Sequence, residues 1–180
     1  MAAAGDWRGV APFAARDGLV LAATAALWWF VIDAGDAGTW RAALNVLVAL
    51  LTAGCGYLVH EWGHLLGCWA RRSHVRMPTA ITSVFLFNFD LGRNDRRQFN
   101  AMAAGGFIAS IAFLALVSAA APLHLLAGKL AAALVAIGVA ATLIFEVPTA
   151  WRVFRGGALP RQGLAFVPRM GDPEKTPEKT

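Results

Sequence analysis

The sequence predicts an all-α polytopic membrane protein with four transmembrane helices, and with a short β-hairpin or re-entrant segment between the second helix and the third. Of its 180 residues, 58% are hydrophobic and only 15% are charged, whereas an average soluble domain has about 25% charged residues. Four apolar segments have the length of a membrane helix, roughly 20 residues, although the first is short. The basic residues are concentrated in alternate connections, which is typical of membrane proteins.

The four apolar segments together define a membrane domain with one flanking segment on each side. Residues 18–150 form the predicted membrane domain, residues 1–17 precede it as a cytoplasmic segment, and residues 151–180 follow it as a cytoplasmic tail. The end of the tail is a tandem Pro-Glu-Lys-Thr repeat, which has nothing to bury and predicts disorder. The predicted spans are about residues 18–32, 42–70, 101–121 and 130–148.

The first span has a second interpretation, because its length also fits the apolar region of a signal peptide. Trp28 and Trp29 stand at its end, where they resemble the aromatic belt of a membrane interface. The segment that precedes it is also longer than the charged start of a signal peptide usually is. Both features favour a membrane helix that stays in the protein.

Lysine and arginine lie almost entirely on one side of the predicted membrane. The N-terminal segment, the connection 71–100 and the tail after residue 150 hold 14 of the 16 basic residues, and the other two connections hold only Arg41 and Lys129. By the positive-inside rule, both termini and the central connection are cytoplasmic. The charges border membrane spans and form no basic face on a soluble module, so no nucleic-acid partner is expected. The composition, rich in alanine and arginine, favours a bacterial inner membrane.

One motif in the second span indicates chemistry, the sequence His60-Glu61-Trp62-Gly63-His64. On a helix, histidines four residues apart share a face and both reach one metal ion. Imidazole pairs of this kind are typical zinc ligands, so the predicted cofactor is Zn²⁺ with His60 and His64 as ligands. Glu61 is the predicted catalytic residue, a general base that takes a proton from water. The alternative is a pair of hydrogen-bonded histidines with a satisfied glutamate, which is costly in hydrocarbon without a task.

A third ligand is expected from another span, and depth in the membrane favours Glu146. His60 lies 19 residues after Arg41, about 28 Å of helix, and Glu146 lies 17 residues after Lys129, about 26 Å. Both helices start on the outer side, so the two side chains are expected at similar depth. Glu61 and Glu146 are the only acids within the four predicted spans. Asp90, in the central connection, is the second candidate for the third ligand.

The central connection contains an aromatic, β-prone stretch at residues 84–90. In a strand there, Phe85, Phe87 and Phe89 would lie on one side. We predict that Phe85, Phe87 and Asn88 bind the substrate, with the strand holding it extended by edge pairing. The alternative is a loop whose phenylalanines anchor in the membrane interface.

Three further predictions concern the interior of the helices. Cys55 and Cys68 are 13 residues apart in one helix, too far for a disulfide. Pro148 is expected to distort or end the fourth helix. Glycines around the motif and at the start of the third span are expected to permit close helix packing. They are Gly54, Gly56, Gly63, Gly67, Gly105 and Gly106.

The stretch from Tyr57 to Gly67, with the basic pair Arg71-Arg72 after it, resembles the site-2 protease class of intramembrane metalloproteases. The resemblance implies a three-helix core over about residues 42–155, with the motif on the first core helix and a β-rich connection after it. In that family the third core helix brings an aspartate to the zinc. Ala150 stands at that position, and Glu146 lies one turn earlier on the same face.

The resemblance also covers the middle core helix, so the chain resembles a minimal, divergent member of the class. Where the family has Gly-Pro and then Asn, this chain has Gly105-Gly106 and Ser110.

The sequence thus predicts an intramembrane zinc metalloprotease that hydrolyses a peptide bond in or near a transmembrane segment. Its expected partners are the lipid bilayer and a membrane-protein or peptide substrate. The alternative is a non-proteolytic metal-binding membrane protein of the same fold, which binds or regulates membrane helices. A transporter is disfavoured, because the four spans show no pair of interrupted repeats.

Overall fold

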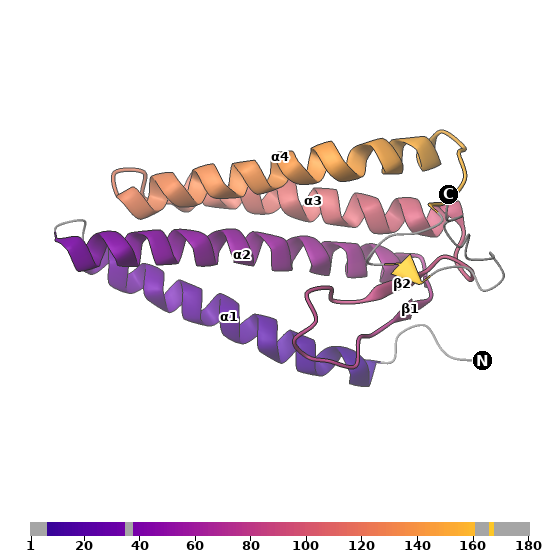
Figure 1. The fold of residues 1–180 in the computed structure, drawn as a ribbon, viewed down its shortest axis with the longest axis horizontal. Helices are drawn as coiled ribbons and strands as arrows, with labels where there is room; N and C mark the ends of the chain where they lie inside the picture. The colour runs from indigo at the N-terminus through magenta and orange to yellow at the C-terminus, as the bar shows by residue number, and fades with distance from the viewer. Residues whose placement is uncertain (1–6, 35–37, 161–165, 168–180) are drawn as a thin grey trace, which may run out of the picture.

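The computed structural model describes residues 7–34, 38–160 and 166–167, which form four long helices and three short strands (Figure 1). All four helices are long and apolar enough to cross a membrane, as predicted. Each extends beyond its predicted span, and the repeat at residues 173–180 lies outside the described residues. The elements are α1 (Trp7–Ala34), α2 (Thr39–Ala70), β1 (Val75–Arg76), β2 (Asn88–Asp90), α3 (Arg96–Ala120), α4 (Leu126–Phe154) and β3 (Phe166–Val167).

The helices lie side by side along the long axis of the molecule, with α2 between α1 on one side and α3 and α4 on the other (Figure 1). α1 meets α2 at one end and diverges from it at the other. The connection from α2 to α3 occupies the space between them there. Residues 77–87, which join β1 to β2, are called the connecting segment below.

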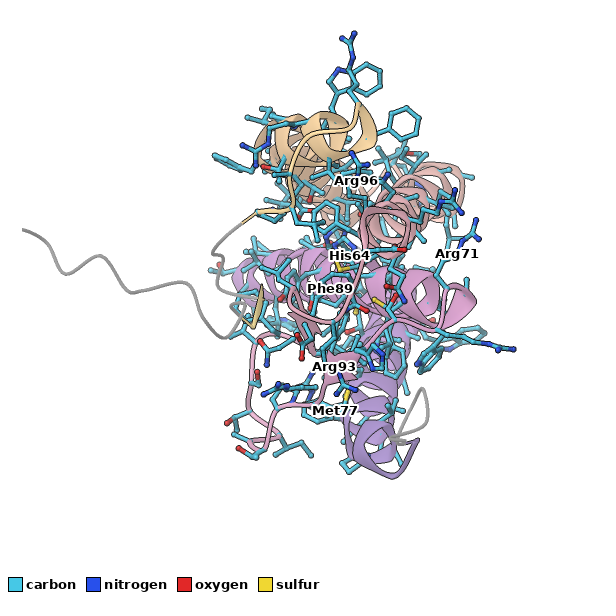
Figure 2. All side chains as sticks on the ribbon, turned by 90° about the vertical axis from the view of Figure 1, so that its right-hand side faces the viewer. His64, Arg71, Met77, Phe89, Arg93 and Arg96 are labelled. Atoms are coloured by element: carbon cyan, nitrogen blue, oxygen red, sulfur yellow. The ribbon has the colours of Figure 1, made fainter. Side chains whose placement is uncertain are left out.

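The described basic residues are divided between the two ends of the bundle. The end that holds the α2–α3 connection faces the viewer in Figure 2, where Arg71, Arg93 and Arg96 are labelled. Arg41 and Lys129 belong to the first turns of α2 and α4, at the opposite end. The sidedness of charge that the sequence predicted is therefore present in the fold, and we call the two ends the basic end and the far end.

An apolar core fills the basic end. Leu65 and Cys68 of α2 pack there with Phe89 of β2 and Phe99 of α3. The Phe89 and Phe99 rings meet edge to face, with their centroids 6.0 Å apart. Cys68 and Cys55 are both buried and free, as predicted.

α2 and α3 approach closely through small residues. A Cβ atom on Gly67 would overlap the backbone carbonyl of Ala101, and one on Gly105 would overlap the carbonyl oxygen of Gly63. Glycine lets the two backbones meet directly, so close packing is confirmed at these positions. Gly54, on the same helix, has nothing near its missing side chain.

Replacing Gly67 with Val is expected to destabilise the bundle, because the new side chain overlaps the backbone of α3. Overpacking of this kind costs about 1–3 kcal/mol. For a chain of this size that lowers the melting temperature by several degrees, measurable by thermal unfolding in detergent. Gly54→Val is the matched control, with valine in the same helix but in open space. Equal melting temperatures for the two variants would contradict this account of the helix contact.

The three strands form one small sheet in the order β1-β2-β3. β1 pairs antiparallel with β2, which confirms the predicted hairpin, and β2 pairs parallel with β3. The strand covers only residues 88–90, so the prediction of one strand over 84–90 with three phenylalanines on one side is wrong. The backbone of residues 84 and 86 bonds side chains of α2 and no neighbouring strand: Val84 accepts from Tyr57, and Leu86 donates to Glu61.

α4 continues through Pro148 to Phe154, so the prediction that this proline ends the helix is wrong. A proline removes one backbone donor, and packing of the following turn compensates for it. That packing comes from Val153, which is buried in the core of the basic end. The other buried residues of α4 all lie near its start: Ala127, Gly128, Ala131 and Val135.

α1 holds a buried acid that the sequence analysis placed outside the membrane. The helix begins at Trp7, so Asp17 lies within it, and Asp17 is only 2% exposed. The expectation that Glu61 and Glu146 are the only acids in the spans is therefore wrong. Asp17 is tolerated there because it is paired with Arg16 and with Trp62 of α2.

Candidate metal centre

Two helices bring the three predicted ligands together. His60 and His64 lie one turn apart on α2, with their ring centroids 4.2 Å apart, and Glu146 reaches them from α4. Its Oε1 lies 3.2 Å from His60 Nε2, and its Oε2 lies 3.5 Å from His64 Nε2. One ligand atom from each residue lies within 4.8 Å of the others, so the group could hold a metal ion.

α3 contributes no ligand but orients both histidine rings. His64 Nδ1 lies 2.8 Å from the carbonyl oxygen of Met102, which can only accept a hydrogen bond. Nδ1 of His64 therefore carries the hydrogen, and Nε2 keeps its lone pair when the ring is neutral. His60 Nδ1 lies 3.2 Å from the Gly106 carbonyl and 2.9 Å from the Ser110 hydroxyl. Such partners fix the tautomer that binds a metal through Nε2.

The donor atoms fit a metal ion in chemistry and in spacing. When both rings are neutral, two imidazole lone pairs face two carboxylate oxygens, and a cation between such acceptors, a proton or a metal ion, stabilises them. Two nitrogens and an oxygen are ligands that divalent transition metals accept. Ligand atoms bound to a tetrahedral ion at about 2.0–2.2 Å are roughly 3.3–3.6 Å apart. The distance from Oε1 to His60, 3.2 Å, and the distance from Oε2 to His64, 3.5 Å, are each close to this range, and one ligand atom from each of the three residues lies within 4.8 Å of the others.

His60 is enclosed, and Glu146 is accessible. His60 is 5% exposed, whereas the side chain of Glu146 is 41% exposed. Gly106 of α3 leaves room for the neighbouring ligand candidate, because a Cβ atom there would overlap the ring of His64. Figure 2 shows His64 towards the middle of the end view, between the labelled arginines. One side of the group is therefore packed against α3, and the other is open at α4.

A cavity of about 470 Å³ adjoins the group on its open side. Glu61 lies in its wall, 8% exposed, and its Oε2 accepts the backbone hydrogen of Leu86 at 3.1 Å. Glu61 thus faces the same space as His64 and Glu146, and it is not one of the three candidate ligands. The other lining residues are mostly apolar: His64, Phe85, Phe87, Phe99, Met102, Ala103, Phe107, Phe145, Glu146, Thr149 and Ala150.

Two of the predicted site residues lie away from the group. Asp90 binds Arg76 Nη2 at 3.1 Å and the backbone of Gly92 at 3.0 Å, so it stabilises the connection and not the metal group. Asn88 pairs with Arg76 in the sheet and does not line the cavity. Of the three predicted substrate-binding residues, Phe85 and Phe87 line the cavity.

Two polar contacts of the site were missed by the sequence analysis. The Ser110 hydroxyl bonds His60, although the sequence analysis noted Ser110 only as a position of family resemblance. The hydroxyl of Tyr57 donates to the Val84 carbonyl at 2.9 Å and so ties the connecting segment to α2. A signal existed for Tyr57: it is the only tyrosine of the chain and lies one turn before Glu61 on the same helix face.

No family model, curated protein or solved structure matches this chain. The resemblance to the site-2 protease class therefore stays a prediction from the sequence.

Proposed function

We propose that the chain is a polytopic protein of the bacterial inner membrane, with its basic end in the cytoplasm. Large apolar side chains are exposed on all four helices, among them Trp29, Leu50, Ile108 and Phe145. Exposed apolar surface on every helix is what contact with lipid requires. The concentration of arginine at one end supports the orientation, by the positive-inside rule.

The protein is, in this proposal, an intramembrane zinc metalloprotease that cleaves a peptide bond in or near a transmembrane segment. The observation that carries the proposal is the convergence of His60, His64 and Glu146 beside the carboxylate of Glu61. Zn²⁺ held by the three residues would supply a Lewis acid that polarises water and the scissile carbonyl. The site resembles sites with three protein ligands, which leave a coordination position open.

Glu61 performs the proton transfers of the reaction. As the oxygen of water bonds to the carbonyl carbon, the carboxylate of Glu61 takes a proton from that water. The same proton passes from Glu61 to the leaving nitrogen as the C–N bond breaks, which yields a carboxylic acid and an amine. The hydrogen bond from Leu86 to Oε2 holds the carboxylate during both steps.

The cavity favours an apolar substrate in an extended conformation. Phe85 and Phe87 line it from the connecting segment, and Phe107 and Phe145 line it from α3 and α4. The backbone of a helix is hydrogen-bonded within the helix. A transmembrane segment must therefore unwind before the water beside Glu61 can reach the carbonyl carbon of a peptide bond. Apolar side chains of an unwound segment would pack against these aromatic rings.

Removal of the metal tests the proposal. The full chain in detergent is expected to contain about one zinc per chain and to cleave an unwound, apolar membrane peptide. A chelator is expected to abolish cleavage, and added Zn²⁺ is expected to restore it. Metal content by elemental analysis and product by mass spectrometry are the two readouts. Zinc without cleavage would support the non-proteolytic alternative, and a chain that binds no zinc would overturn both.

Replacing Ser110 with Ala is expected to weaken zinc binding by about tenfold, the lower end of the effect of losing a hydrogen-bond partner of a metal ligand. The loss is moderate, because His60 Nδ1 keeps the Gly106 carbonyl as a partner. Competition against a chelator of known affinity measures it. Ser118→Ala is the matched control, since Ser118 lies on the same helix and is exposed. Equal affinities of the two variants would contradict the role of Ser110.

A further inference from the structure

An ion pair of α1 has no part in the metal centre, and it joins a buried Asp17 to an Arg16 side chain that is 25% exposed. The Nε of Arg16 donates to Asp17 Oδ1 at 2.7 Å, and the indole nitrogen of Trp62 donates to Asp17 Oδ2 at 2.8 Å. A buried charge in an apolar helix is costly unless it is paired, so such a residue calls for a function. Each oxygen of Asp17 has a partner, and one partner is the residue that follows Glu61 in the motif.

Arg16 extends this pair to the connecting segment. Its Nη1 donates to the carbonyls of Ile81 and Ser83, and the distance to Ser83 is 3.0 Å. A guanidinium is a rigid planar fork, so the carboxylate that holds its Nε also fixes the direction of Nη1. Asp17 therefore orients Arg16 towards the backbone of the connecting segment.

The connecting segment leads from these contacts to Glu61 within a few residues. The hydroxyl of Ser83 donates to the Phe85 carbonyl at 2.9 Å, which stabilises the bend of the backbone at residues 84–86. The Val84 carbonyl accepts from Tyr57, and the Leu86 backbone donates to Glu61. The segment is thus fixed to α1 at residues 81 and 83 and to α2 at residues 84 and 86.

We propose that Arg16 and Asp17 are positioning residues for peptide hydrolysis. They hold the connecting segment against α1, so that the backbone hydrogen of Leu86 keeps the Glu61 carboxylate directed into the cavity. The catalytic part of this inference rests on the proposed function, whereas the restraint on the segment does not. Among the described residues, α1 supplies no candidate ligand and no side chain to the cavity beside the metal group, yet it would set the orientation of the base.

Hydrogen exchange and kinetics on the full chain test this inference. In Asp17→Asn and Arg16→Met, the amides of residues 81–87, Leu86 above all, are expected to exchange about tenfold faster, as local opening becomes easier. The kcat is expected to fall about tenfold at unchanged KM and unchanged zinc per chain, as for a base held less well. Arg16→Lys keeps the charge but cannot donate to the carboxylate and both carbonyls together, so it is expected to show the same local change.

Thr24→Val is the matched control, because it removes a buried polar contact between α1 and α2 that lies away from the connecting segment. Thr24 accepts from Cys55 Sγ at 3.5 Å. This variant is expected to leave exchange at residues 81–87 and kcat unchanged. A merely structural role for Asp17 would instead accelerate exchange along α1 and α2, and would lower zinc content together with kcat.

Two results would overturn the inference: unchanged exchange at residues 81–87 in all three variants, or faster exchange there with an unchanged kcat. Failure of the proposed function gives a different result. A wild-type chain that cleaves nothing, or a Glu61→Gln variant that cleaves at the wild-type rate, would remove the protease assignment. The exchange comparison would still decide whether Arg16 and Asp17 hold the segment.

Discussion

Replacing Glu61 with Gln is expected to lower the rate of peptide hydrolysis by at least about 100-fold. General acid–base catalysis contributes about 10²–10⁴-fold to enzymatic rates, and an amide can neither take the proton from water nor return it to the leaving nitrogen. The substitution keeps the size of the side chain. Its amide oxygen can still accept the hydrogen of Leu86, so the connecting segment is expected to stay in place.

The measurement is kcat at saturating substrate, with zinc per chain determined on the same preparation. Zinc content is expected to match that of the wild-type chain, because Glu61 is not one of the three ligands. Asp33→Asn is the control, since it also neutralises an acid but at an exposed position near the far end of α1. A Glu61→Gln variant with the wild-type kcat would show that Glu61 is not the base.

Replacing Glu146 with Ala is expected to reduce zinc affinity by more than about 100-fold. Loss of a partner that only orients a ligand costs about 10–100-fold, and Glu146 is proposed as a ligand itself. The variant also leaves the Nε2 atoms of His60 and His64 without the carboxylate that bridges them. His60→Ala is expected to have an effect of the same order.

Asp90→Ala is the matched control for Glu146→Ala. It also removes an acidic side chain, but one that binds Arg76 and the backbone of Gly92. Chelator competition on both variants gives the two affinities. Wild-type affinity in Glu146→Ala, or a loss in Asp90→Ala as large as that expected for Glu146→Ala, would assign the third ligand elsewhere.

The helices and the group of candidate ligands could be predicted because they depend on the rise and the repeat of the α-helix, which are constant. The rise of a helix is constant, so two residues at equal distance from the far end come to equal depth. This is how Glu146 was matched to His60, 86 positions away in the sequence. The spacing of His60 and His64 likewise follows from the helical repeat alone.

The hairpin between α2 and α3 could be predicted, but the path of the connecting segment could not, because distant side chains determine it. Residues 84 and 86 have β-prone neighbours, yet their backbone bonds Tyr57 and Glu61. Asp17 was missed for the same reason. A polar Arg16-Asp17 pair before an apolar run is typical of the end of a span. Only the contact with Trp62 shows that Asp17 is packed between α1 and α2.

The uneven packing of α4 would make its position sensitive to a metal ion held by Glu146. All residues of α4 are described, and between Val135 and Val153 none of them is buried. Glu146 lies within this stretch and carries the contacts to the histidines of α2. A ligand that binds only the docked arrangement stabilises it by a free energy that rises with the logarithm of the ligand concentration, once that concentration exceeds the dissociation constant. In the proposed protease, zinc binding and the docking of α4 against α2 are thus linked equilibria. Zinc would cross-link the two helices as well as act as a Lewis acid.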